Sequence, residues 1–129
     1  MAIGGKYTFV VIDDDALLRS LIQGILKDAG YELVAAAPNG EQGLKDCFER
    51  RPDFVMLDIN LPGTGGLDVL KNLRRMANPP RVIMVSGEAT MSHVRSALEH
   101  GANGFVVKPF NAARLLAAVE GALRSAPLP

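Results

Sequence analysis

Short apolar runs that each end at a chemically useful polar residue are the feature of this chain that most limits its fold. The runs and the residues that follow them are 9–12 before Asp13 and Asp14, 54–57 before Asp58, 82–85 before Ser86, and 105–107 before Lys108. Runs of this length are typical of strands that are buried on both faces of a parallel sheet. Because parallel strands bring their carboxyl ends to one edge of the sheet, we expect these polar residues to meet there.

Apolar runs alternate with segments of helical periodicity along the whole chain. Strands are expected at 7–12, 32–36, 54–57, 81–85 and 104–107, and the last helix is expected to follow Asn111 and to end near Arg124. This alternation predicts an α/β fold, in which helices cover both faces of a parallel sheet. Crossovers must be right-handed, and we expect a doubly wound five-stranded sheet in the order 2-1-3-4-5. In such sheets ligands bind where the strand order reverses, beyond the ends of the first and third strands.

Two of the expected helices carry apolar residues that should face the sheet. The second helix should begin at Asn39 and should direct Cys47 and Phe48 inward. The fourth helix should direct Ala97 and Leu98 inward. Cys47 is then a small core residue and not a redox sensor.

Composition bounds the domain count and the location. The chain has 129 residues, 48% of them hydrophobic, so we expect residues 1–129 to form a single domain with a core from about 7 to 124. Residues 125–129 would be a tail or the start of a linker. The 14 basic and 14 acidic residues balance, which argues against nucleic-acid binding by this domain. No apolar run approaches the roughly 18 residues of a membrane span, and a lone Cys47 without a signal peptide favours the cytoplasm, so no membrane partner is expected.

Charge counting predicts a metal at the shared sheet edge. Asp13, Asp14 and Asp58 would converge with Lys108 as the cation among the strand-end residues, so the cluster would carry about −2. A divalent cation offsets that charge, and oxygen-only ligands favour Mg²⁺ over Zn²⁺. Carboxylates with a hard cation, a lysine and the hydroxyl of Ser86 suit phosphoryl transfer. An aspartate can itself be the nucleophile and form an acyl phosphate.

Four motifs together carry a resemblance to a known family. They are VIDDD at 11–15, DFVMLDINLPG at 53–63, VSG at 85–87 and VKPF at 107–110. With them the chain resembles the receiver domain of the response regulators of bacterial two-component signalling, in particular the chemotaxis regulators. The resemblance extends from Phe9 to Arg124, and it implies a flavodoxin-like fold that works in a two-component or phosphorelay system.

The resemblance implies a role for each residue of the site. Asp58 would accept a phosphoryl group from a histidine kinase or a histidine phosphotransfer protein. Asp14, Asp58 and the backbone carbonyl of Asn60 would bind Mg²⁺ directly, and Asp13 would help to hold the ion through water. Lys108 would contact the phosphoryl oxygens.

The resemblance also implies a switch that responds to the phosphoryl group. Ser86 would move toward that group, and the aromatic side chain of Phe105 would turn inward behind it. Asn60 and Glu88, each two positions past a site residue, would tune the rate of dephosphorylation. The Lys108–Pro109 peptide bond would be cis, which aims the lysine at the phosphoryl group.

Two positions depart from the usual pattern of the family. Phe105 stands where many members have tyrosine, so this ring offers no hydroxyl group to a partner. Gly65 and Gly66 stand where an acidic residue and a glycine are usual, and this pair is expected to loosen the start of the third helix.

The output is expected to be a changed contact with a downstream protein or an attached output domain. The last helix has an apolar arc of roughly 160°, wider than one core-facing stripe needs. Its rim at Ala112, Leu116 and Leu123 is either exposed or part of a broad buried face. If it is exposed, the fourth helix, fifth strand and fifth helix form a surface, with Arg95 and Leu116, for a partner or a homodimer.

Two other classes of function stay open on the sequence. One is a metal-dependent phosphatase or phosphotransferase with an aspartyl-phosphate intermediate, but such enzymes usually carry a second acid where this chain has Asn60. The other is a constitutive interaction module that is no longer phosphorylated, which the complete set of acids, hydroxyl and lysine disfavours. We therefore expect a domain that assists its own phosphorylation and dephosphorylation and is not an enzyme with an external substrate.

Overall fold

Five parallel strands form a single sheet in the computed structural model, which describes residues 7–87 and 91–124. The strands are β1 (Thr8–Ile12), β2 (Glu32–Ala37), β3 (Phe54–Asp58), β4 (Arg81–Ser86) and β5 (Gly104–Val107). Their spatial order is β2-β1-β3-β4-β5, which confirms the predicted doubly wound topology. The order reverses between β1 and β3, so the strand ends on either side of that point can share a site.

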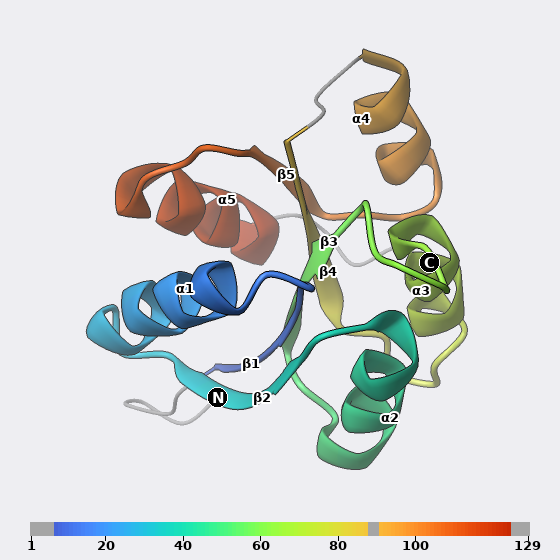
Figure 1. The fold of residues 1–129 in the computed structure, drawn as a ribbon, viewed down its shortest axis with the longest axis horizontal. Helices are drawn as coiled ribbons and strands as arrows, with labels where there is room; N and C mark the ends of the chain where they lie inside the picture. The colour runs from blue at the N-terminus through green and yellow to red at the C-terminus, as the bar shows by residue number, and fades with distance from the viewer. Residues whose placement is uncertain (1–6, 88–90, 125–129) are drawn as a thin grey trace.

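Helices cover both faces of this sheet (Figure 1). They are α1 (Ala16–Asp28), α2 (Gly40–Arg50), α3 (Gly66–Arg74), α4 (Met91–Glu99) and α5 (Ala112–Arg124). Helices α1 and α5 lie on one side, and α2, α3 and α4 lie on the other (Figure 1). Alternate residues of β1 point to opposite faces of the sheet. Phe9 and Val11 pack with α1 and α5, whereas Val10 and Ile12 pack with α2 and α3. None of the helices in the described part of the chain is long and apolar enough to span a membrane.

Side chains at the starts of three helices satisfy backbone N–H groups there. Asp15 caps α1 by accepting from the N–H groups of Leu17 and Leu18 at 2.9 and 3.3 Å. Asn39 caps α2, as predicted, and Asn111 accepts from the first turn of α5. These caps place the helix starts directly behind the strand ends, where the site residues lie.

The start of α3 depends on close backbone packing. Gly65, its N-cap residue, has no side chain to cap the helix. The N–H of Gly66 instead donates to the carbonyl of Ile59 at 3.1 Å, and a Cβ at Gly66 would overlap the carbonyl oxygen of Asp58. The helix therefore begins directly against the end of β3.

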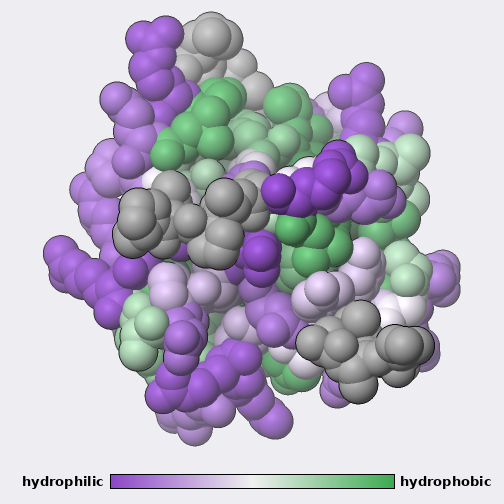
Figure 2. All heavy atoms as spheres, turned by 180° about the vertical axis from the view of Figure 1, so that it is seen from behind, coloured by the Kyte–Doolittle hydropathy of each residue, from purple (hydrophilic) through white to green (hydrophobic). Residues whose placement is uncertain are grey.

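The structure corrects two side-chain predictions and several strand boundaries. Phe48 is 51% exposed and Leu98 is 52% exposed, so the prediction that they face inward was wrong, while Cys47 and Ala97 are fully buried. Both exposed residues lie next to a buried position, and the helix rotation directs them outward. Apolar patches also interrupt the hydrophilic surface on the face that Figure 2 shows. Strands β2, β3 and β4 each extend one residue further than predicted, and β1 begins one residue later.

Candidate functional site

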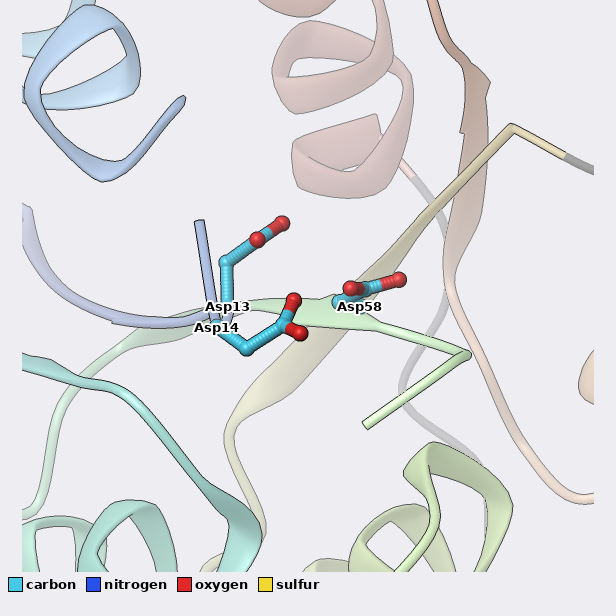
Figure 3. Close-up of side chains that lie close together, drawn as sticks. All are labelled: Asp13, Asp14 and Asp58. Atoms are coloured by element: carbon cyan, nitrogen blue, oxygen red, sulfur yellow. The ribbon is translucent and has the colours of Figure 1, made fainter. Parts of the chain in front are cut away.

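Three carboxylates converge beyond the ends of β1 and β3 (Figure 3). One carboxylate oxygen from each of Asp13, Asp14 and Asp58 lies within 4.8 Å of the others. Asp13 and Asp58 are buried, and Asp14 is exposed. The structure thus brings together the acids that the sequence predicted to meet, with one side of the cluster open to solvent.

Asp13 is held through its backbone as well as its side chain. Its N–H donates to the carbonyl of Ala37 at 3.1 Å. Its Oδ1 accepts from the N–H of Asp15 at 2.9 Å, and its Oδ2 accepts from Nζ of Lys108 at 3.1 Å. Its carbonyl accepts from Nη1 of Arg19 at 2.7 Å. No role for Arg19 was predicted from the sequence. The feature that could have indicated one is its position, because it is a cation six residues after Asp13, near the start of the next helix.

Lys108 reaches the cluster from the end of β5. Its Nζ lies 3.6 Å from Oδ2 of Asp58, in addition to its contact with Asp13. Its backbone N–H donates to the carbonyl of Ser86 at 2.8 Å, which continues the pairing of β4 with β5. The Lys108–Pro109 bond is cis, which confirms what the family resemblance implied.

The environment of Asp58 disfavours its ionised form. Burial raises the pKa of Asp58 above its ordinary value, and the carboxylates of Asp13 and Asp14 act in the same direction. The N–H of Asn60, which donates to Oδ1 at 3.1 Å, and the ammonium of Lys108 oppose that rise without cancelling it. A cation placed among these carboxylates would stabilise the ionised form. The donors are all oxygen atoms, which fits a hard cation such as Mg²⁺.

Ser86 and Phe105 lie behind the acids on β4 and β5. Ser86 is the last residue of β4 and is fully buried. Phe105 is half-buried and packs against the core layer that contains α3. It also borders a surface hollow of about 370 Å³ against α5, lined there by Arg114, Ala117 and Ala118. The ring therefore lies between the core and the α5 surface.

Three further predicted residues lie in the described part of the chain, namely Asn60, Arg95 and Leu116. The side chain of Asn60 is exposed, and Glu88 lies outside the described residues. Arg95 is exposed on α4 beside a hollow that Leu98 also lines. Leu116 is half-buried on α5.

The rim of α5 is only partly exposed. Ala112 is exposed, whereas Leu123 packs against the core that α1 and α5 share. Val107 on β5 is 44% exposed. Accessible apolar side chains therefore occur separately on α4, on β5 and at Ala112 and Leu116 of α5.

Comparison with known proteins agrees with this geometry. The family model for the response regulator receiver domain matches residues 9–120. The chemotaxis protein CheY of Bacillus subtilis is 38% identical over 117 residues, which cover 91% of this chain and 98% of that protein. The transcriptional regulatory protein PrrA of Mycobacterium tuberculosis is 40% identical over 116 residues, which cover 89% of this chain and 49% of PrrA.

A solved structure shares the fold. The CheX-CheY-BeF3-Mg²⁺ complex from Borrelia burgdorferi contains a chain that superposes with a TM-score of 0.88 at 26% identity, covering 92% of this chain and 90% of that one. Fold, site and sequence similarity extend over the same residues. The chain belongs to the response regulator receiver domain family.

Proposed function

We propose that this domain is a phosphorylation switch in which Asp58 accepts a phosphoryl group from a histidine kinase or a histidine phosphotransfer protein. The observation that carries the proposal is the convergence of Asp13, Asp14 and Lys108 on the buried carboxylate of Asp58. A carboxylate oxygen of Asp58 would attack the phosphorus atom as the bond to the donor nitrogen breaks. The product is an acyl phosphate, and the imidazole leaves as the neutral ring because its released nitrogen takes a proton from solvent.

Mg²⁺ fits the donors at this site. Asp14, Asp58 and the carbonyl of Asn60 would hold it directly, and Asp13 would do so through water. When bound, the ion neutralises the oxygens of the transferring phosphoryl group. Receiver domains generally bind Mg²⁺ at such an acidic pocket, and the related Borrelia complex contains Mg²⁺ together with BeF3.

Lys108 and Ser86 supply the remaining polar contacts. The ammonium of Lys108 already lies 3.6 Å from Asp58, so a small shift away from Asp13 brings it to a phosphoryl oxygen. The hydroxyl of Ser86, at the end of the adjacent strand, would donate to another of these oxygens. Asn60 and Glu88 would tune how fast water removes the group.

The proposed output is a changed protein contact. Movement of Ser86 would draw Phe105 inward, and the surface around Arg95 and Leu116 would change with it. CheY occurs in a complex with CheX in the related Borrelia structure, and PrrA is about twice the length of the matched region. A downstream protein, an attached output domain and a second copy of this domain are therefore the partners to test.

Labelling with a small phosphoryl donor tests this function. Wild-type protein incubated with acetyl phosphate and Mg²⁺ should gain the mass of one phosphoryl group, and Asp58→Asn should gain none. Asp46→Asn, which removes a half-buried acid of α2 away from the cluster, is the matched control and should label like wild type. Labelling of Asp58→Asn, or failure of the wild type both to label and to bind BeF3 with Mg²⁺, would overturn the proposal. The same samples incubated with a phosphomonoester would show whether the domain has an external substrate, which we do not expect.

A further inference from the structure

Arg19 connects helix α1 to the end of strand β1. Its backbone N–H donates to the carbonyl of Asp15 at 3.0 Å within the helix. Its half-buried side chain turns back, and Nη1 donates to the carbonyl oxygen of Asp13 at 2.7 Å. This is a short hydrogen bond from a charged donor, a class that is stronger than hydrogen bonds between neutral groups.

The carbonyl that Arg19 binds belongs to the peptide unit that joins Asp13 to Asp14. A peptide unit is planar, so fixing its oxygen also fixes the direction in which the chain enters Asp14. The carboxylate of Asp14 is exposed, and within residues 7–87 and 91–124 it accepts no hydrogen bond. Its position therefore depends on its backbone, which Arg19 holds.

We propose that Arg19 is a positioning residue for the cation site. It orients the Asp13–Asp14 peptide so that the Asp14 carboxylate stays beside those of Asp13 and Asp58 before any cation binds. This inference rests on the proposed Mg²⁺-dependent function. The side-chain hydrogen bond of Arg19 is with the carbonyl oxygen of Asp13 and not with a carboxylate of Asp13, Asp14 or Asp58, so it acts through the backbone.

Removing the Arg19 guanidinium changes the Mg²⁺ affinity in one direction if Arg19 positions Asp14, and in the other direction if Arg19 acts only through its charge. Removing a cation near carboxylates strengthens the binding of another cation if only Coulomb forces act. Removing the group that orients a metal ligand weakens binding, by about 10-fold to 100-fold for groups that support metal ligands. The two effects have opposite directions, so one titration distinguishes them.

The experiment compares Arg19→Met, Arg19→Lys and Lys27→Met with wild type. Methionine keeps an unbranched apolar stem and removes both charge and donor. Lysine keeps the charge and a donor but lacks the planar fork of arginine. Lys27→Met removes an equal charge from the last turn of the same helix, away from Asp13, and is the matched control.

Mg²⁺ binding to metal-free protein is measured by calorimetry, and the amide exchange of residues 13–15 is measured without metal. We expect Arg19→Met to weaken Mg²⁺ binding by about 10-fold or more and to speed amide exchange at Asp14. Arg19→Lys should bind with intermediate affinity, and Lys27→Met should bind like wild type or slightly more tightly. If Arg19→Met fails to fold, Arg19→Lys serves alone and must bind more weakly than wild type.

Wild-type affinity or tighter binding in folded Arg19→Met, or in Arg19→Lys when it serves alone, would overturn the role of Arg19 and leave the proposed function intact. A wild-type protein that binds no Mg²⁺ would overturn both.

Discussion

Nζ of Lys108 lies 3.1 Å from Oδ2 of Asp13, although the two residues are 95 positions apart in the chain. The contact with Asp58 is longer, at 3.6 Å. The lysine thus partly neutralises the acids that we propose to bind Mg²⁺. A bound cation and the ammonium would compete for the same carboxylates.

Lys108→Met should tighten Mg²⁺ binding and weaken the binding of BeF3. Removing the ammonium leaves two buried carboxylates with more unbalanced charge, which favours an added cation by about 1 kcal/mol or more. The same change removes a donor to the phosphoryl-like fluorides. Calorimetric titration with Mg²⁺, and then with BeF3 at saturating Mg²⁺, checks both effects. Weaker Mg²⁺ binding in Lys108→Met would contradict this assignment.

Asp58→Asn should stabilise the metal-free protein at neutral pH. Burial raises the pKa of Asp58 in the folded state above its value in the unfolded state, so the folded state binds the proton more tightly. The resulting gain in the free energy of unfolding is fully present at pH values below the unfolded pKa. That stability is lost as the pH rises through the folded pKa. The advantage of the variant should therefore be present at pH 7, shrink as the pH falls through the folded pKa, and disappear below the unfolded pKa, as measured by urea unfolding in the presence of EDTA. Asp46→Asn, which removes a half-buried acid of α2, is the control for the loss of one carboxylate.

Cys47 should resist thiol reagents in the folded protein. Burial raises its pKa to about 12, and the nearby Asp46 adds to the rise, so little thiolate forms at neutral pH. One thiol per chain should react with a disulfide reagent in urea and essentially none in native buffer. The stability of the fold should also fall as the pH rises above about 9, where the unfolded thiol ionises and the buried one does not. Rapid labelling of the native protein would show that Cys47 is accessible.

Gly66→Ala should destabilise the fold at the proposed phosphoacceptor. The added Cβ would overlap the carbonyl of Asp58 and lie 2.6 Å from Cα of Ile59, and backbone atoms there cannot move aside cheaply. We expect a loss of roughly 1–3 kcal/mol in the free energy of unfolding. Gly24→Ala is the control, because a Cβ at this position meets nothing within 4 Å. The same change also replaces a glycine inside helix α1 by a better helix former. The free energy of unfolding of Gly24→Ala should rise by up to about 1 kcal/mol. Equal effects of the two changes on that free energy would contradict the packing argument.

Leu116→Glu should weaken partner or self-association of the BeF3-bound domain. Leu116 is half-buried, so a carboxylate can reach water in the free domain but would lose water in a contact. Sedimentation of the BeF3-bound protein, with and without a candidate partner, measures the effect. Leu17→Glu, at a position that is 84% exposed on α1, is the control for an added charge. Unchanged association in Leu116→Glu would remove α5 from the proposed surface.

The topology and the members of the acidic cluster followed from the sequence because both depend on short-range pattern. Apolar runs of strand length alternate with helical periodicity, and that alternation restricts the sheet to few arrangements. The polar residues that end β1, β3, β4 and β5 then share one edge. On this basis the sequence alone groups Asp13, Asp58 and Lys108, which the structure brings together.

Tertiary structure alone decided how the helices turn their side chains and which polar groups pair. Phe48 and Leu98 have the same local pattern as buried residues, yet the rotation of α2 and α4 against the sheet exposes them. The bond from Arg19 to Asp13 depends on where α1 starts relative to β1, and the preference of Lys108 for Asp13 depends on differences of less than one ångström. Periodicity identifies the elements and their ends, but the relative placement of packed elements sets distances on that scale.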